Sequence, residues 1–166
     1  MYLKEPCIED AEKLYAFISE MPLDENGFTN PRYGASFEVL KGRFLPMMRD
    51  YALGKNLPDG FVPETFLFLW HEGEIVGEFR IRHYLTEALR NGAGHIGYFI
   101  KKEHRGKGFG TSGLSLTLEK ARAIIPEDEI YLRVNRDNAP SLRVILKNGG
   151  YVHHEDDEKY YLRIKK

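Results

Sequence analysis

The stretch from Ile96 to Leu118 reads IGYFIKKEHRGKGFGTSGLSLTL, and it decides both the fold and the main site of this chain. Its apolar start predicts a strand over His95 to Lys101, and the apolar stripe further on predicts a helix from about Phe109 to Ile125. Glycines in the turn between them let successive N–H groups converge, and the helix start adds partial positive charge. The segment therefore predicts an anion-binding turn; a plain loop with solvated lysines is the alternative.

Two common phosphate-binding motifs do not explain this turn. Nothing in the chain matches the Walker A pattern G-x-x-x-x-G-K-[ST]. Gly108, Gly110 and Gly113 satisfy the dinucleotide pattern G-x-G-x-x-G, but in that fold the first glycine follows its strand almost directly. Here Lys102 to Arg105 intervene, and only about 55 residues follow the turn. We therefore reject both motifs.

Working outward from the turn, the periodicity predicts alternating strands and helices without internal repeats. Pro46 is expected to kink or split the second helix. We read one α/β domain over residues 1–166 in the order β-α-α-β-β-β-α-β-α-β-β. The remaining expected elements are a strand at Tyr2 to Lys4, helices at Ile8 to Met21 and Ser36 to about Ala52, a hairpin of Thr65 to His71 with Glu74 to Leu85, a strand at Ile130 to Asn135, a helix at Ala139 to Lys147, and a hairpin of Tyr151 to His154 with Tyr160 to Ile164.

Composition excludes several classes of protein. The 166 residues hold 24 Lys or Arg against 25 Asp or Glu, a formal net charge of −1, so we expect no nucleic-acid or membrane partner. Cys7 is the only cysteine, and the charged residues among the first 20 break any signal-peptide core, which predicts a soluble cytoplasmic protein. The positive charge is instead local, since four basic residues surround the turn: Lys101, Lys102, Arg105 and Lys107.

Two motifs carry a resemblance to a known family. Residues 105–110, RGKGFG, resemble the R/Q-x-x-G-x-G/A motif of the GNAT superfamily of acetyl-coenzyme A-dependent N-acetyltransferases. Residues 138–151, NAPSLRVILKNGGY, look like the N-x-x-S-x-x-V-x-x-K-x-G-[FY] block of the branch that includes ribosomal-protein acetyltransferases, with one residue inserted before the aromatic. Residues 82–98 further resemble a group of uncharacterised predicted acetyltransferases within the superfamily.

The resemblance implies a GNAT fold, in which a single mixed central sheet of about six or seven strands is flanked by about four helices. It also implies that acetyl-coenzyme A is the co-substrate, with no metal. The family lays the pantetheine arm along its fourth strand, and a main-chain N–H near Ile100 stabilises the oxyanion. By resemblance, the residues that bind the coenzyme are Phe99, Ile100 and Lys102 through the backbone, the amides of Arg105, Gly106, Lys107, Gly108, Phe109, Gly110 and Thr111, and also Asn138, Ser141 and Lys147.

Amine acetylation needs a neutral amine. An amine with a lysine-like pKa of ~10.4 is neutral in roughly one molecule in 2,500 at pH 7, a penalty of about 4.6 kcal/mol. His83 and His95 are candidate bases, because pairing Leu85 with Ala93 would place these histidines opposite each other on one face. A slip of one residue would destroy that pairing, and two such histidines can also be structural. Glu78 is the carboxylate alternative.

The departing thiolate needs a proton, and many family members supply it from a tyrosine about six residues after the asparagine. Val144 holds that position here. Ser141 is then the most plausible hydroxyl, although it could simply lie at the helix start, and Tyr98 is a further phenol near the site.

We therefore expect an acetyltransferase that moves an acetyl group to a primary amine by direct attack in a ternary complex. The alternative is a noncatalytic acyl-coenzyme A-binding or regulatory domain, which Val144 supports. The acceptor, a small molecule or a peptide, is not identified, and an exposed strand edge could form a homodimer. Residues 1 to 60 hold ten acids against seven Lys or Arg, a mild bias that favours a cationic amine.

Overall fold

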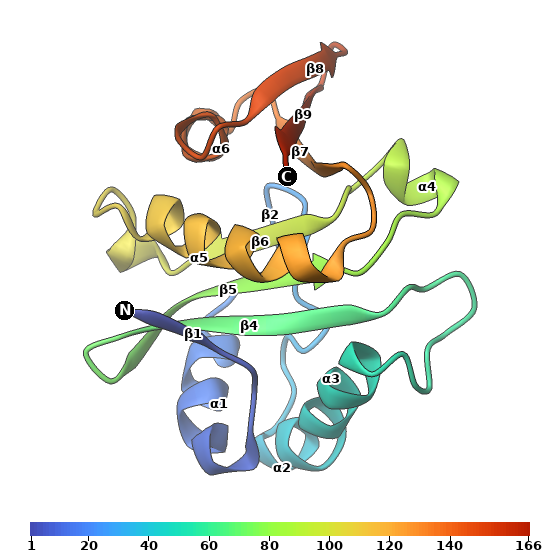
Figure 1. Ribbon diagram of the computed structural model, residues 1–166. Helices are drawn as coiled ribbons and strands as arrows, with labels where there is room; N and C mark the ends of the chain where they lie inside the picture. Colours follow the sequence, from blue (N-terminus) through green and yellow to red (C-terminus); the bar gives the residue numbers. More distant parts are fainter.

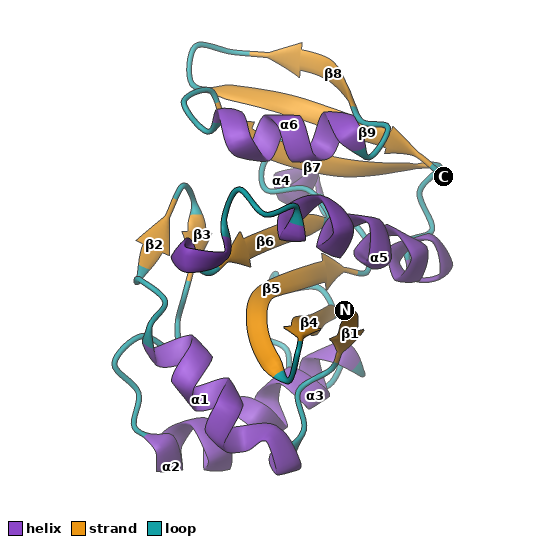
Figure 2. Ribbon diagram, turned by 90° about the vertical axis from the view of Figure 1, so that its left-hand side faces the viewer, coloured by secondary structure: helices purple, strands orange, loops and turns teal.

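A computed structural model describes all residues 1–166 as alternating strands and helices (Figures 1 and 2). The first half contains β1 (Tyr2–Lys4), α1 (Ala11–Ser19), β2 (Asp24–Glu25), β3 (Phe28–Thr29), α2 (Phe37–Val39), α3 (Leu45–Ala52), β4 (Glu64–His71) and β5 (Glu74–Arg82). The second half contains α4 (Glu87–Arg90), β6 (Ile96–Ile100), α5 (Phe109–Ile124), β7 (Glu129–Asn135), α6 (Ala139–Lys147), β8 (Tyr151–Glu155) and β9 (Lys159–Lys165). None of these helices combines the length and the apolar content that crossing a membrane requires.

Seven of the strands form two antiparallel sheets that meet at one point. The first sheet has the order β1-β4-β5-β6, and the second has the order β7-β9-β8. A single isolated bridge, Gly94 to Leu132, joins them. The predicted α/β fold, with several central strands flanked by helices, is confirmed, and the expected single sheet is divided between β6 and β7.

Strand β4 separates two hydrophobic cores because its side chains alternate between the two faces of the sheet. Leu67 and Leu69 pack in one core, which α5 covers, whereas Phe66, Phe68 and Trp70 pack in the other core beneath α1 and α3. Figure 1 shows α5 on one side of β4 and α1 to α3 on the other. Since both faces are covered, the strand is buried at six of its eight positions and is apolar without a break from Phe66 to Trp70.

The second predicted helix is interrupted, as Pro46 suggested, but the irregularity precedes the proline. A π-helical turn over Leu40–Phe44 separates α2 from α3, and Pro46 lies in the first turn of α3. A proline is tolerated there, because an N–H in the first turn of a helix has no acceptor within that helix.

A short β2–β3 hairpin was not predicted. Asn26 and Gly27 form its turn with φ of 54° and 81°, both in the left-handed region. An Asn-Gly pair is the strongest local signal for such a two-residue hairpin, so the sequence contained the information. The hairpin lies beside β6 (Figure 2), and this position makes it part of the site described below.

The packing of α5 against the first sheet depends on Gly113. A Cβ built at this position overlaps the Phe79 ring and lies 2.9 Å from Leu69 Cδ2. We expect Gly113→Ala to lower the free energy of unfolding by about 1–2 kcal/mol, because overpacking outweighs the gain in helix propensity. Gly42→Ala meets no atom within 4 Å and is the control, expected to be neutral or stabilising. Urea unfolding of both variants measures the difference, and equal stabilisation would contradict the packing.

Candidate acetyl-coenzyme A cleft

A cleft of about 760 Å³ opens where the two sheets diverge. Its walls are the edges of β6 and β7, the β2–β3 hairpin, the loop before α5 and the inner side of α6. Figure 2 shows the arrangement of these elements, with β6 on one side and β7 with α6 on the other. Arg80 and Arg82 of β5 also line it, so the cleft is built by elements from four separate parts of the chain.

The closed end of the cleft depends on a glycine and a histidine. A Cβ on Gly94 would lie 2.8 Å from the Tyr131 carbonyl carbon, so only glycine allows this approach, and its φ of 70° is left-handed. The next residue, His95, donates its main-chain N–H to Tyr131 O at 2.7 Å. Beyond these contacts no further bridge joins β6 to β7.

The His95 side chain belongs to this junction and does not line the cleft. It is fully buried, its Nδ1 accepts the Tyr131 N–H at 2.9 Å, and its Nε2 lies 3.2 Å from Glu127 Oε2. Because Nδ1 is an acceptor, the neutral ring carries its proton on Nε2, facing the carboxylate. Burial lowers the pKa of His95 despite the opposing pull of Glu127. The geometry assigns this ring a structural position.

The predicted pairing of His83 with His95 is wrong by one residue. Ile81 pairs with Ile96, and the Arg82 N–H donates to His95 O at 2.8 Å. His83 leaves the ladder, since its N–H donates to Pro63 O at 2.9 Å, and its Nε2 lies 2.8 Å from Thr65 Oγ1. The register of β5 with β6 thus differs by one residue from the predicted pairing of Leu85 with Ala93, and the connection between the two strands contains the short helix α4.

Glu78, the carboxylate alternative, is also outside the cleft lining. It is fully buried and accepts from Arg32 and Arg80, each at 2.7 Å. Burial alone would raise the pKa of Glu78, but the attraction of the two guanidinium groups outweighs burial, and the pKa is lowered. A carboxylate so held is a structural anion rather than a proton acceptor for an amine. The roles predicted for His83, His95 and Glu78 have no support from their positions.

The glycine-rich turn presents open main-chain donors to the cleft. Gly106 and Gly108 have left-handed φ of 75° and 86°, and Gly108 is the N-cap of α5. The Ser112 N–H to Gly108 O is the first helical bond of α5, so the amides of Phe109, Gly110 and Thr111 have no helical partner. This is the anion-binding geometry that the sequence predicted.

Two of the four basic residues predicted around the turn are neutralised. The Arg105 guanidinium binds Glu25 of β2 through two bonds of 2.8 and 2.6 Å, and its Nε donates to Ile100 O at 2.9 Å. Lys101 pairs with Glu20 at 2.6 Å and with Glu103 at 3.0 Å. Arg105 therefore anchors the β2–β3 hairpin to the turn instead of presenting a free charge.

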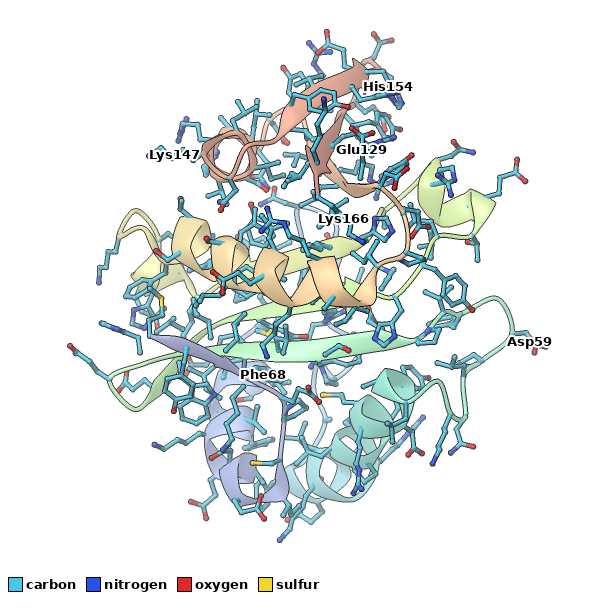
Figure 3. All side chains as sticks on the ribbon, viewed as in Figure 1. Asp59, Phe68, Glu129, Lys147, His154 and Lys166 are labelled. Atoms are coloured by element: carbon cyan, nitrogen blue, oxygen red, sulfur yellow. The ribbon has the colours of Figure 1, made fainter.

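Helix α6 supplies the cations that the turn lacks. Lys147, which the sequence predicted, and Arg143, which it did not, both line the cleft without an ion-pair partner. Figure 3 shows Lys147 on α6, above α5 in that view. Gly110 brings the helices together, since its Cβ would lie 3.2 Å from Val144 Cγ2. Lys102 and Lys107 are not among the residues that line this cleft.

The edge of β6 offers free main-chain groups on alternate residues. The Arg82 N–H bonds to His95 O, and the Lys101 N–H bonds to Val76 O at 3.0 Å. Ladder bonds alternate along an antiparallel pair, so residues 95, 97, 99 and 101 pair with β5, and residues 96, 98 and 100 face the cleft.

This alternation corrects the predicted backbone contacts. The carbonyl of Phe99 points toward β5, where it would lie 2.8 Å from a Cβ on Gly77, so the Phe99 backbone is not free for a ligand. Lys102 lies in a 3₁₀ turn outside the cleft. Among Phe99, Ile100 and Lys102, only Ile100 has a main-chain N–H that faces the cleft. The N–H of Tyr98 also faces the cleft, although Tyr98 was not predicted to bind the coenzyme.

Tyr98 and Ser141 meet inside the cleft. The Tyr98 phenol lies 2.7 Å from Ser141 Oγ, and its ring stacks on Phe79 with centroids 5.4 Å apart. Burial raises the pKa of Tyr98 to about 12, so the phenol keeps its proton at neutral pH. Asn138 caps α6, since its Oδ1 accepts the Ser141 N–H at 3.2 Å, and its Nδ2 has no partner.

The cleft, with its anion-binding turn beside a split sheet, is that of an acyl-coenzyme A-dependent transferase fold. The sequence matches the family described as "Acetyltransferase (GNAT) domain" over residues 1–150. The chain therefore belongs to the GNAT acetyltransferase family. No curated protein matches it in sequence.

Several solved structures share this fold. RimJ of Mycobacterium smegmatis in complex with coenzyme A disulfide has a TM-score of 0.66 and 20% identity, over 98% of this chain and 80% of that one. Aminoglycoside acetyltransferase AAC(6')-Ib with coenzyme A has a TM-score of 0.65 and 16% identity, over 99% and 94%. The ribosomal-protein-S5-alanine acetyltransferase of Vibrio fischeri has a TM-score of 0.65 and 19% identity, over 97% and 90%. At these identities the likeness shows the fold alone.

The neutral state of His95 has a consequence for stability. Its folded-state pKa is lowered, so the unfolded chain binds the proton first as the pH falls below ~6.5, and folding loses up to about 1.4 kcal/mol per pH unit from this group. His95→Gln keeps an acceptor for Tyr131 but does not titrate. We expect this variant to lose less stability than the wild type between pH 7.5 and pH 5, measured by urea unfolding. Equal losses would contradict the assignment, and His153→Gln, which removes an exposed histidine, is the matched control.

Proposed function

We propose that the protein transfers an acetyl group from acetyl-coenzyme A to a primary amine by direct attack in a ternary complex. One observation carries the proposal: open main-chain donors lie on the edge of β6 and again at the start of α5, along a cleft into which α6 brings the unpaired Arg143 and Lys147. A pantetheine arm is an amide chain, so it can pair with the outward groups of β6 as an added strand. The diphosphate then falls at the helix N-terminus, where the partial positive charge stabilises it.

The coenzyme fits the residues present on both chemical and geometric grounds. The amides of Phe109, Gly110 and Thr111 would hold the diphosphate, with Arg143 and Lys147 opposite them on α6. The Asn138 Nδ2 can donate to an amide carbonyl of the arm.

When bound, acetyl-coenzyme A supplies an acetyl group activated as a thioester, whose thiolate needs a proton on leaving. The Tyr98–Ser141 pair is the proton source that the cleft offers, because Tyr98 stays protonated and Ser141 lies in hydrogen-bond contact with it. Ser141 gives its proton to the leaving thiolate and recovers one from Tyr98 along the same hydrogen bond, and the proton that the attacking amine loses restores the Tyr98 phenol. The Tyr98 and Ile100 N–H groups face the cleft and can donate to a carbonyl oxygen.

The coenzyme site can be tested without an acceptor. We expect the double variant Arg143→Gln/Lys147→Gln to weaken binding of coenzyme A by about tenfold or more, a loss of about 1.4 kcal/mol. Isothermal titration calorimetry measures the Kd. Lys120→Gln removes an exposed lysine from α5 and should leave the Kd unchanged. Equal affinity of the double variant and the wild type would remove α6 from the site.

The proton source is tested by Ser141→Ala. We expect kcat to fall by about a hundredfold while the Kd of coenzyme A stays within about twofold, since the hydroxyl acts on the leaving thiolate rather than on the phosphates. Thiol release with an accepted amine measures kcat, and Ser115→Ala, at an exposed serine of α5, is the control. An unchanged kcat would leave Ser141 a helix-start residue.

Val144 favours one alternative, a noncatalytic acyl-coenzyme A-binding domain. It lines the cleft where the family resemblance expects a tyrosine acid, and its methyl groups pack against Gly110. Coenzyme binding together with no thiol release across a broad amine panel would support that alternative over transfer.

A further inference from the structure

Three arginines share the face of the two sheets that points away from α5. On β5, Phe79 and Ile81 pack in the core beneath α5, so Arg80 and Arg82 project to the opposite face. On β7, Leu132 and Val134 pack in that same core, and Arg133 between them projects away. All three arginines line the cleft.

No residue of α1 or α3 lines the cleft, so at the cleft this face is the one open to an acceptor. The diphosphate donors and α6 lie on the α5 side, so a nucleophile approaching the middle of the cleft must come from the other side. The β2–β3 hairpin borders that side through Phe28, whose ring lies 6.1 Å from that of Phe99. Any acceptor would therefore pass the arginines.

The first arginine is only partly neutralised. Arg80 donates to Glu78 Oε1, while Arg32 donates to Glu78 Oε2, so two guanidinium groups share one buried carboxylate. The Arg80 guanidinium also lies over Phe28, 4.3 Å from the ring centroid, and donates to Thr29 O at 3.0 Å. These contacts hold it rigidly but leave one positive charge in excess.

The positive charges of the other two arginines, Arg82 and Arg133, are less well neutralised by acidic partners. Arg82 lies 3.5 Å from Glu64 Oε1 and donates to Gly94 O at 3.2 Å. Arg133 has no carboxylate within ion-pair distance. Burial lowers the pKa of Arg82, and the like charges of Arg80 and Arg133 act in the same direction, against the opposing pull of Glu64. Four guanidinium groups on this side thus face two carboxylates.

The acids that line the cleft do not offset this excess. They are Glu25 and Asp137, and Glu25 is already bound by Arg105. The acidic bias of residues 1 to 60 therefore does not appear at the cleft. Asp137 is unpaired, but it is exposed in the loop before α6. Beside β5 and β7, a second ammonium group on the acceptor would therefore meet the arginines.

We propose that the acceptor amine carries a carboxylate in the same molecule, which Arg82 and Arg133 bind. This inference rests on the proposed acetyl transfer. The planar guanidinium fork matches a carboxylate, and a partly buried charge gains most from such a partner. The same positive field disfavours the ammonium form of the incoming amine, which eases its deprotonation. Acceptors with several ammonium groups, such as aminoglycosides, are repelled.

Matched amine pairs test this directly. The small-molecule pair is 5-aminopentanoate and pentylamine, and the peptide pair is Ser-Asp-Ala amide and Ser-Asn-Ala amide; each pair differs by one carboxylate. We expect kcat/KM to favour the carboxylate member of at least one pair by about tenfold or more, mainly through KM. The pair that shows the preference identifies a small molecule or a peptide as the acceptor.

The preference must depend on the arginines. In Arg82→Gln, Arg133→Gln and the double variant we expect the ratio within the pair to fall to about twofold. Arg122→Gln, an exposed position on α5, should keep the full ratio. Preference for the member without a carboxylate or for 1,5-diaminopentane, or a ratio that survives in the double variant, would overturn the proposal.

Failure of acetyl transfer is distinguishable from failure of the carboxylate site. If coenzyme A binds but no amine releases thiol, the proposed function fails, and the site is judged by thermal shift of the coenzyme-saturated protein. Stabilisation by 5-aminopentanoate but not by pentylamine, lost in the double variant, supports the site. No carboxylate-dependent shift at tens of millimolar overturns it.

Discussion

The architecture depends on one contact between two sheets. Gly94 lets β6 approach β7, and His95 then provides a main-chain bond and a ring acceptor to Tyr131. Because pairing stops there, β6 keeps an unpaired edge along the cleft. The cleft lies along this edge. The contact of Gly94 and His95 with β7 fixes where β6 and β7 diverge, and so it sets the distance from β6 and its following turn to α6 on the opposite side.

A second device joins the two sides of the site. The pair of hydrogen bonds between Arg105 and Glu25 connects the turn before α5 to the β2–β3 hairpin, which borders the acceptor side. Arg105 also binds Ile100 O, so the hairpin, the turn and the edge strand are held by one side chain. The motif arginine thus acts through geometry, while Arg143 and Lys147 provide the charge.

The two sides of the cleft differ in the charged groups that they present to a ligand. On the α5 side, main-chain dipoles and α6 cations suit phosphates. On the other side, the arginines of β5 and β7 outnumber their acidic partners, because Glu78 binds Arg32 as well as Arg80, and Glu64 lies 3.5 Å from Arg82. Arg133 has no acidic partner. In the proposed carboxylate site, Arg82 and Arg133 would select the acceptor, and both lie outside residues 105–110 and 138–151, the two GNAT motifs.

Local patterns in the sequence determined the elements, the anion-binding turn and the family resemblance, because each depends on neighbours within a few residues. The boundaries of α6 were predicted correctly, and those of β4, β5 and α5 within three residues. The predicted pairing of His83 with His95 was wrong, because the contacts between β5 and β6 place Arg82 opposite His95, and a shift of one residue exchanges the faces of a strand. Only the tertiary structure decided that Arg105 is neutralised, that Tyr98 meets Ser141 and that Arg80, Arg82 and Arg133 share a face. Each of these depends on residues far apart in the chain, whose distance is set by how the sheets and helices pack.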